Sequence, residues 1–481
     1  MSATHPAASS HPAASSATSP GDAANSPAAS PYLVAPPGAI LARTAAPIIL
    51  VMTLSGSLNI VDAAFLGWYV GPSAVAAVSA IFPVFALLIA LSTMVGSGMA
   101  SLLARRLGAG DVTGARALLA SAHGLALALS LVLAAGFALA GAGLTRGLAG
   151  GAGPVADMAW RYLAILVGAA PVMFWLGLQV DALRSEGRAM LMAGLSVLVT
   201  LVNLALNYVL IARLGLGVAG SAIGTAAAQT LALGLALAAR GRIDTPLPLA
   251  ALLAHRWWGG WPRILALGAP LSLNFLGLAL VATVIITTLQ ATDAPDYVTT
   301  LAAYGLVTRL MGFVFLPLMG LAQAMQSITG NNVGAGLPAR SDRVLGLSLA
   351  AGLAYGLGVE AAFLGLAPAI GGMFTGDPAI IAELGRILRP MMALYALSAP
   401  ILLLALYFQA VGQAGRAALL TLSKPYLLQP PLIVALGWAL GPQAIWYALP
   451  LADALLIALA LGTWWRLRRP GRPGFALATG P

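Results

Sequence analysis

Long apolar runs alternate with short polar breaks from about residue 42 onward. A helix needs ~20 consecutive, mostly apolar residues to cross the hydrocarbon core of a bilayer, and each of these runs is at least that long. The pattern predicts an all-α integral membrane protein with twelve transmembrane helices, at residues 42–69, 73–103, 116–143, 157–181, 189–212, 217–239, 262–290, 298–327, 344–368, 381–411, 416–440 and 443–465.

Composition agrees with a membrane protein and excludes several other classes. The chain is 60% hydrophobic and 8% charged, whereas soluble domains carry about 25% charged residues. It has no Cys and four scattered His, so we expect no thiolate or histidine metal site. The sequence also lacks the phosphate-binding pattern GxxxxGK[ST], so we expect neither direct use of ATP nor any enzyme activity.

The basic residues predict which ends of the helices face the cytoplasm. If the N-terminus is inside, 18 of the 24 Lys and Arg residues fall at cytoplasmic helix ends and five at outer ends. Such a bias is typical of inner (plasma) membrane proteins, and an even number of spans puts both termini in the cytoplasm. The net charge of +10 therefore belongs to loops beside the lipid bilayer, and we expect no nucleic-acid partner.

The second half of the chain repeats the first. Residues 75–110 align without a gap to residues 301–336, an offset of 226, and both segments end in Gly-Ala-Gly. A Gly-Arg-Ala triplet at 187–189 recurs at 415–417, an offset of 228. These offsets divide the twelve spans into two six-helix lobes that run in the same direction. Two parallel lobes around a central cavity suit alternating-access transport.

The repeat also sets the expected domain boundaries. We predict an N-lobe at 39–240, a cytoplasmic loop between the lobes at 241–261 and a C-lobe at 262–467. Residues 1–38 are mostly Ala, Ser and Pro, without the basic and apolar parts of a signal peptide. This composition predicts a disordered cytoplasmic tail, and residues 468–481 form a second cytoplasmic tail.

Asp62 is the first candidate for chemistry. It lies in the apolar run at 44–69 and is the only acidic residue between Asp22 and Asp111. A carboxylate at mid-membrane costs ~2.5–3.5 kcal/mol or more, so an acid there is a functional candidate by default. Pro47 lies 15 residues earlier. It is either a helix hinge, because proline removes a backbone hydrogen bond, or the start of the helix.

Two later helices carry a second polar group. Asn203 and Asn207 are four residues apart and share one helix face, and Ser221 and Thr225 follow in the next helix. The amides could bind a protonated carboxyl group or offer oxygen atoms to a cation. Polar side chains also hold membrane helices together without any ligand, and both interpretations stay open at this point.

Other charged residues are less informative. Glu360, Asp453 and Arg309 lie within predicted spans, and for the two acids we favour structural or cavity roles over roles in coupling. We interpret Arg309 as a buried charge without an obvious partner. Four acids beside the basic cytoplasmic loops are expected to be solvated: Asp111, Asp181, Glu186 and Asp342.

Several motifs in order resemble the multidrug and toxic compound extrusion (MATE) family. They are NIVDAAFLG around Asp62, LARRLGAGD, LRSEGR, NLALN and the stretch from LAAYGLVTR to GNNVGAG. The resemblance covers about residues 40–465. It implies a monomeric exporter of amphipathic, often cationic drugs or toxic metabolites. Inward flow of H⁺ or Na⁺ would drive export, and no cofactor is implied.

The resemblance also implies a coupling site. In proton-coupled prokaryotic members a helix 1 Asp, a bending Pro, a helix 5 Asn and a helix 6 Thr match Asp62, Pro47, Asn203 and Thr225. Their second helix 5 Asp is replaced here by Asn207. The helix 7 and helix 10 acids of another, often Na⁺-coupled branch are also missing. One carboxylate among neutral amides favours H⁺, with Na⁺ at Asp62 as the alternative.

Two other functions compete with drug export. A lipid-linked saccharide flippase of a related two-lobe fold would carry more basic residues in its cavity than the spans provide here. A membrane receptor or scaffold that transports nothing would need neither the duplication nor Asp62. For an antiporter we expect protonation of Asp62 to weaken its helix contacts and to let helix 1 bend near Pro47.

Overall fold

The computed structural model describes residues 30–292 and 296–467, without the side chains of 58–60, 63–64, 72 and 463–467. Within these residues the regular secondary structure is entirely helical. Long apolar runs are expected to form helices, because in a bilayer every backbone N–H and C=O must be hydrogen-bonded within the protein.

The first six predicted spans each become one helix or a closely joined pair. A short helix, α1 (Pro31–Val34), precedes them. The spans are α2 (Pro37–Tyr69), α3 (Pro72–Ala80) with α4 (Phe82–Gly108), α5 (Val112–Leu148), α6 (Pro154–Ser185), α7 (Ala189–Asn207) with the π-helical η2 (Tyr208–Arg213), and α8 (Gly217–Arg242).

The last six spans follow a linker that contains α9 (Ala250–Ala254). They are α10 (Trp261–Ala291), α11 (Tyr297–Gly334), α12 (Pro338–Gly372), α13 (Pro378–Met392) with α14 (Tyr395–Ala410), α15 (Ala414–Leu422) with η3 (Ser423–Leu428) and α16 (Gln429–Leu440), and η4 (Pro442–Tyr447) with α17 (Ala448–Leu467). Eleven helices of the described chain are long and apolar enough to cross a membrane, and α13 with α14, bent by 55°, makes a twelfth. The predicted all-α fold is confirmed.

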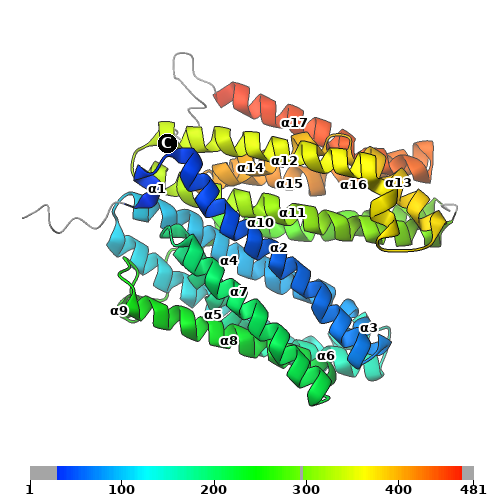
Figure 1. Ribbon diagram of the computed structural model, residues 1–481, viewed down its shortest axis with the longest axis horizontal. Helices are drawn as coiled ribbons and strands as arrows, with labels where there is room; N and C mark the ends of the chain where they lie inside the picture. Colours follow the sequence, from blue (N-terminus) through cyan, green and yellow to red (C-terminus); the bar gives the residue numbers. More distant parts are fainter. Residues whose placement is uncertain (1–29, 293–295, 468–481) are drawn as a thin grey trace, which may run out of the picture.

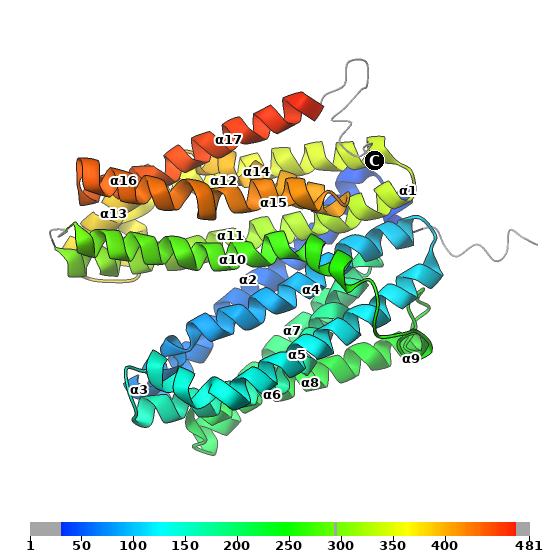
Figure 2. The same ribbon diagram turned by 180° about the vertical axis from the view of Figure 1, so that it is seen from behind.

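The helices form two bundles that meet at one end and diverge toward the other (Figure 1). Helices α2–α8 make the first bundle and α10–α17 the second, here called the N-lobe and the C-lobe. We call the end where they meet the closed end; α1, α9 and the turns from α4 to α5 and from α11 to α12 lie there (Figure 2). The opposite end, with α3 and α13, is the open end.

Glycines allow the two lobes to touch backbone to backbone at the closed end. A Cβ atom on Gly108 of α4 would collide with the carbonyl group of Asn331, and one on Gly334 of α11 would collide with that of Arg105. Each residue of the first contact lies 226 positions from its counterpart in the second. This reciprocity is the pattern of a two-fold contact, so the repeat seen in the sequence relates the two lobes in space.

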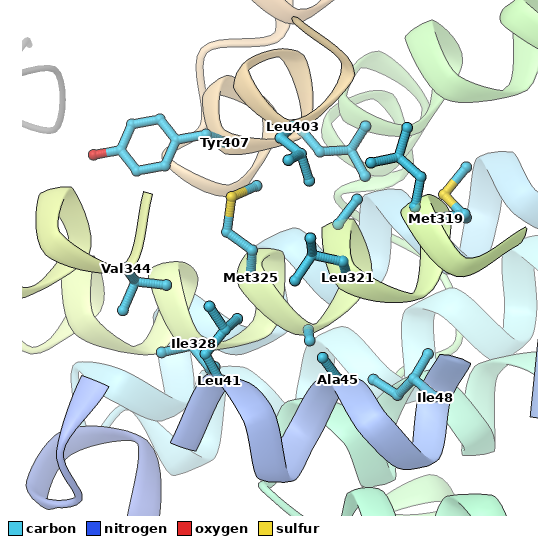
Figure 3. Packing of buried hydrophobic residues seen from close by; sticks show 14 of the residues in the cluster. Leu41, Ala45, Ile48, Met319, Leu321, Met325, Ile328, Val344, Leu403 and Tyr407 are labelled. Atoms are coloured by element: carbon cyan, nitrogen blue, oxygen red, sulfur yellow. The ribbon is translucent and has the colours of Figure 1, made fainter. Parts of the chain in front are cut away.

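An apolar core continues from one lobe into the other (Figure 3). Leu41 and Ile48 of α2 belong to the same buried cluster as Met325 and Ile328 of α11, and Leu403 of α14 lies on its far side. Helix α2 therefore packs along the C-lobe near the closed end, although the chain assigns it to the N-lobe.

The N-terminal boundary of the fold differs from the prediction. Residues 30–38 are ordered, where we expected a disordered tail over 1–38. The Tyr32 side chain is fully buried, and its hydroxyl donates to the Arg184 carbonyl oxygen at 2.6 Å while Arg340 donates to the Tyr32 carbonyl oxygen at 3.3 Å. Burial raises the pKa of Tyr32 to about 12, so the hydroxyl stays a donor. The remainder of both predicted tails lies outside the described residues.

The linker between the lobes is packed against the N-lobe. Leu247 is fully buried, and its carbonyl oxygen accepts from Nη1 of Arg240 at 3.0 Å. Nε of Arg116 donates to the Pro246 carbonyl oxygen at 2.8 Å. The predicted loop at 241–261 thus contains a segment held by two helices of the N-lobe.

Candidate ion-coupling site

A cavity of about 280 Å³ lies inside the N-lobe. Helices α2, α4, α6, α7 and α8 line it, and most of the lining side chains are apolar, such as Phe85, Leu166 and Met173. Of the described residues that line this cavity, Asp62 alone is charged. The polar lining residues include Asn203 and Thr225.

The predicted polar residues come together at one side of this cavity. Nδ2 of Asn207 donates to Oδ1 of Asp62 at 2.6 Å and lies 3.4 Å from Oδ1 of Asn203. Nδ2 of Asn203 donates in turn to Oγ1 of Thr225 at 3.1 Å. A chain of hydrogen bonds therefore joins Asp62 of α2 to Thr225 of α8 through Asn207 and Asn203 of α7. Ser221, from the same predicted group, bonds with Tyr162.

Asn207 is the most enclosed member of this group. Its side chain is fully buried, and its Oδ1 has no hydrogen-bond partner among the described residues. That oxygen faces Gly224, where a Cβ atom would collide with it. The π-helical η2 begins at the next residue, and π-helical segments often occur at functional sites. Asn207 thus offers Asp62 an amide group with an unused acceptor.

Pro47 lies inside α2 and does not start it. The helix begins at Pro37, so Pro47 is nearly three turns into it, and the interpretation as a helix-start proline is wrong. Two residues later, Ile49 packs so closely on α11 that a Cβ atom on Gly320 would approach its backbone nitrogen to 3.0 Å. The missing backbone hydrogen bond at Pro47 is therefore next to the contact between the lobes.

Glu360 and Asp453 are placed in the C-lobe, away from the cavity. Oε2 of Glu360 accepts from the backbone N–H of Ala396 at 3.0 Å, where α14 begins after its break from α13. A carboxylate at a helix N-terminus is favourable there. Asp453 forms an ion pair with Lys424 in η3. Both contacts agree with structural roles.

Arg309 differs from the sequence interpretation as a buried charge. Its side chain is exposed, and it has no ion pair or hydrogen bond within the described chain. It lies in α11 on the open-end side of the contact with α2. A Cβ atom added at the nearby Gly305 or Gly312 would meet no other atom within 4 Å, so this face of α11 is open, although Val307 on the opposite face is fully buried.

Three acids expected to be solvated are in fact buried or paired at the closed end. Asp181 accepts from Arg184 at 2.7 Å, Glu186 pairs with Arg240 at 2.7 Å, and Asp342 accepts from the Tyr407 hydroxyl at 2.8 Å. Only Asp111 is exposed as expected, at the N-terminus of α5. The spacing of Asp181 and Arg184, three residues apart on one helix, was a signal for pairing.

No group of three His, Cys, Asp or Glu that could hold a metal ion occurs in the described chain. The chain of hydrogen bonds through α2, α7 and α8 contains a single carboxylate, that of Asp62. The arrangement can take up one proton on Asp62, or hold one monovalent cation with the neighbouring oxygen atoms of Asn203 and Thr225.

The sequence model of the MatE family matches this chain at residues 47–209 and again at 273–434. The second match begins 226 residues after the first, the same offset as the internal repeat. Together the matches cover well over half of the chain, one for each lobe.

Curated relatives agree with this assignment. The chain is 26% identical over 435 residues to the FAD transporter of Shewanella oneidensis, covering 88% of this chain and 93% of that protein. It is 24% identical over 420 residues to the multidrug export protein MepA of Staphylococcus aureus, covering 86% and 89%.

A solved structure shows the same fold. It is an outward-facing multidrug resistance MATE family transporter of the MOP superfamily, similar to this chain with a TM-score of 0.82 at 22% identity over 95% of this chain and 100% of that one. The two-lobe arrangement, the twelve spans and the double family match have one explanation. The chain belongs to the MATE family of multi-pass membrane transporters.

Proposed function

We propose that this protein is a cation-coupled antiporter that exports amphipathic, often cationic small molecules, with H⁺ as the coupling ion. One observation carries the proposal: among the described residues that line a mostly apolar cavity, Asp62 is the single charge, and neutral amides hold it. An apolar cavity with one negative charge suits a cation with an apolar body. The same charge is also the group that a proton can neutralise.

The geometry around Asn207 supports H⁺ over Na⁺. The amide presents N–H groups to Asp62, whereas Na⁺ would need oxygen atoms on that side. When Asp62 takes up a proton, its new O–H needs an acceptor. Oδ1 of Asn207 has no partner among the described residues, and a turn of the amide would supply it. Asn207 can therefore donate to the ionised form of Asp62 and accept from its protonated form. No second acid is needed for this exchange.

The contacts of α2 suggest how protonation could move the lobes. A neutral Asp62 holds α7 less strongly, because hydrogen bonds to an ionised group are about twice as strong as neutral ones. Helix α2 would then bend at Pro47, beside its contact with α11, and reshape the cavity. Substrate would leave at the open end. The proton would leave at the other end after the open end closes and the closed end opens.

The distribution of charge supports a cytoplasmic closed end. Basic residues at the turns of this end include Arg105, Arg116, Arg188, Arg240 and Arg340. Positive residues on short loops remain in the cytoplasm. We therefore infer an inner-membrane protein with both termini inside and lobes that open outward in this structure.

The two curated relatives suggest different substrates. MepA is named for multidrug export and the Shewanella protein for FAD. FAD carries a diphosphate, which would meet Asp62 in a cavity whose described lining has no basic side chain. The cavity therefore favours cationic drugs over a dinucleotide. It disfavours a lipid-linked saccharide flippase for the same reason, since the diphosphate of such a lipid would need a cation.

Dye uptake into everted membrane vesicles tests the proposal. A fluorescent cationic dye is offered outside, with either an acidic or a Na⁺-loaded lumen, to wild type, Asp62→Asn and the control Glu360→Gln. We expect uptake with the acidic lumen alone, loss in Asp62→Asn, and normal uptake in the control, whose amide still accepts from Ala396. Full uptake by Asp62→Asn contradicts the mechanism. Uptake that needs Na⁺ makes Asp62 a sodium site, and no uptake under either gradient favours a narrower substrate or a flippase.

A further inference from the structure

A second cavity of about 220 Å³ lies between the lobes near the closed end. Helices α2, α4, α6, α7, α10 and α11 line it. Val180 and Ser196 line both this chamber and the N-lobe cavity that holds Asp62. The two cavities therefore adjoin at these side chains.

The chamber contains an ion pair. Nη2 of Arg184 donates to Oδ1 of Asp181 at 2.7 Å, and Nη1 of Arg184 donates across the lobes to Oε1 of Gln323 in α11 at 2.6 Å. Asp181 keeps 22% of its side-chain surface accessible and Arg184 only 2%. The guanidinium group thus has one partner in each lobe, and the carboxylate is the more accessible member of the pair.

Several buried polar atoms of the chamber lack partners in the described part of the chain. They are Nε of Arg184, Oγ of Ser97 and Nε2 of Gln326, and each of these residues is more than nine-tenths buried. Buried polar groups are normally hydrogen-bonded to protein or water. A polar cavity of this size can hold several water molecules. Water in the chamber would satisfy these atoms and would give a proton a route to Asp181.

We propose that Asp181 is a second proton-binding carboxylate of the transport cycle and that its pair with Arg184 locks the closed end. The inference rests on the proposed H⁺ coupling. A proton released from Asp62 crosses the adjoining cavities and adds to a carboxylate oxygen of Asp181. The ion pair becomes a neutral carboxyl group beside a guanidinium ion, and the proton leaves toward the closed end when Asp181 ionises again.

Neutralisation of Asp181 would act on the lobes through Arg184. A buried ion pair that loses one partner leaves an uncompensated charge, which is strongly destabilising. Among the described lining residues, Asp181 and Arg184 alone are charged; the other polar ones, from α4, α7 and α11, are Ser, Thr and Gln. No second anion of this lining is at hand to replace Asp181. Separation of the lobes would break the bond to Gln323 and hydrate Arg184.

The lock has no counterpart in the C-lobe. The positions 228 residues after Asp181 and Arg184 are Gln409 and Gly412. Nε2 of Gln409 donates to the Leu267 carbonyl oxygen at 2.7 Å, a neutral contact that a proton does not change. Among the described residues that line the chamber, Asp181 is therefore the one carboxylate whose protonation changes the charge.

The absence of native Cys allows a direct test. Cysteines replace the exposed residues Thr113 of α5 and Ala339 of α12, at the closed end of each lobe, and carry spin labels in the full-length protein in nanodiscs. Pulsed electron paramagnetic resonance gives the distance between the lobes as a function of pH, without and with Na⁺. In the parent protein we expect the separated population to grow as the pH falls.

Three variants make the test specific. Asp181→Asn should show the separated population at every pH. Asp181→Glu keeps a carboxylate and should keep a pH response with a shifted midpoint. The control Asp342→Asn changes another closed-end acid outside the chamber and should behave as the parent. A parent-like pH response in Asp181→Asn, no pH response in the parent, or a response to Na⁺ alone would overturn the proposal.

The vesicle assay separates this inference from the proposed function. If the parent moves no dye but its lobes still follow pH through Asp181, the lock stands and the proposed substrate and coupling fail. If dye uptake follows the pH gradient through Asp62 while Asp181→Asn retains both normal uptake and the normal pH response, the antiporter stands and the lock is wrong.

Discussion

Asp62 and Asp181 are two carboxylates of one lobe with different partners. Asp62 accepts from a neutral amide of Asn207, and Asp181 accepts from the guanidinium group of Arg184. Neutralising Asp62 leaves no charge behind, so its direct effect is on the hydrogen bond between α2 and α7, and it reaches the other lobe only if α2 bends at Pro47. Neutralising Asp181 leaves the buried guanidinium group of Arg184 between the lobes without a negatively charged partner. The partner of each acid therefore decides whether its protonation acts on a helix contact within the N-lobe or directly on a charge between the lobes.

The contact between Asn207 and Asp62 leads to a prediction at the residue scale. Asn207→Ala removes the donor, and a hydrogen bond to a charged group contributes about 1.5–3 kcal/mol. We expect proton-driven dye uptake to fall roughly 10- to 100-fold, since ~1.4 kcal/mol is a factor of ten. Thr225→Val, which removes only the acceptor for Asn203, is the control and should lose less. Equal uptake by Asn207→Ala and the parent would mean that the amide has no part in coupling.

Helix α2 is the element that links the candidate coupling site to the interface. It carries Asp62 in the N-lobe cavity and, about four to six turns earlier, packs Leu41 and Ile48 into the core shared with α11. Pro47 lies between Asp62 and most of this packed segment. Its fixed backbone and missing N–H create a weak point where the rest of the helix is continuous.

If Pro47 is a hinge, its replacement should change both the stability of α2 and the rate of transport. Proline inside a helix costs about 3 kcal/mol, so Pro47→Ala should raise the melting temperature in detergent. The same change should slow dye uptake, because α2 would resist bending. Pro368→Ala, which removes a proline inside α12, should stabilise without slowing uptake. A Pro47→Ala protein that is stabilised and fully active would rule out the hinge.

At the scale of the whole molecule, a pair of reciprocal contacts defines the closed end. Gly108 and Gly334 each lie against the backbone of the other lobe, and the two contacts are related by the repeat. Nη1 of Arg105 donates to the Ala410 carbonyl oxygen at 3.0 Å, and its counterpart Asn331 donates to that of Ser185 at 3.1 Å. The closed end is therefore an interface of matched halves, which alternating access, as proposed above, would have to separate.

Matched substitutions test this symmetry. Gly108→Ala and Gly334→Ala each push a Cβ atom into a carbonyl group, and overpacking of this kind costs about 1–3 kcal/mol. We expect both to lower the melting temperature by similar amounts and to raise the separated population in the spin-label experiment. Gly136→Ala in α5, with open space around it, is the control. Unequal effects of the two closed-end variants would show that the lobes do not share the interface equally.

The sequence by itself determined the features that depend on local pattern. The length of each apolar run predicts a span because a bilayer has a fixed thickness, and the 226-residue offset predicts two like lobes. The polar group of Asn203, Asn207 and Thr225 followed from rare polar residues in apolar helices, which need partners, and the resemblance to the MATE family implied that Asp62 belongs with it. Their role in coupling stays a prediction.

Tertiary structure decided the features that depend on contacts between distant segments. Composition predicted a disordered residue 32, but Tyr32 is buried because Arg184 and Arg340, far along the chain, meet around it. Asp181 was expected to be solvated and Arg309 to be buried, and both expectations were wrong for the same reason. Asp181, near the end of α6, is paired and partly buried where the two lobes meet, and Arg309, within a span, is exposed where the lobes diverge. Burial is a property of the assembled pair of lobes, which no single segment encodes.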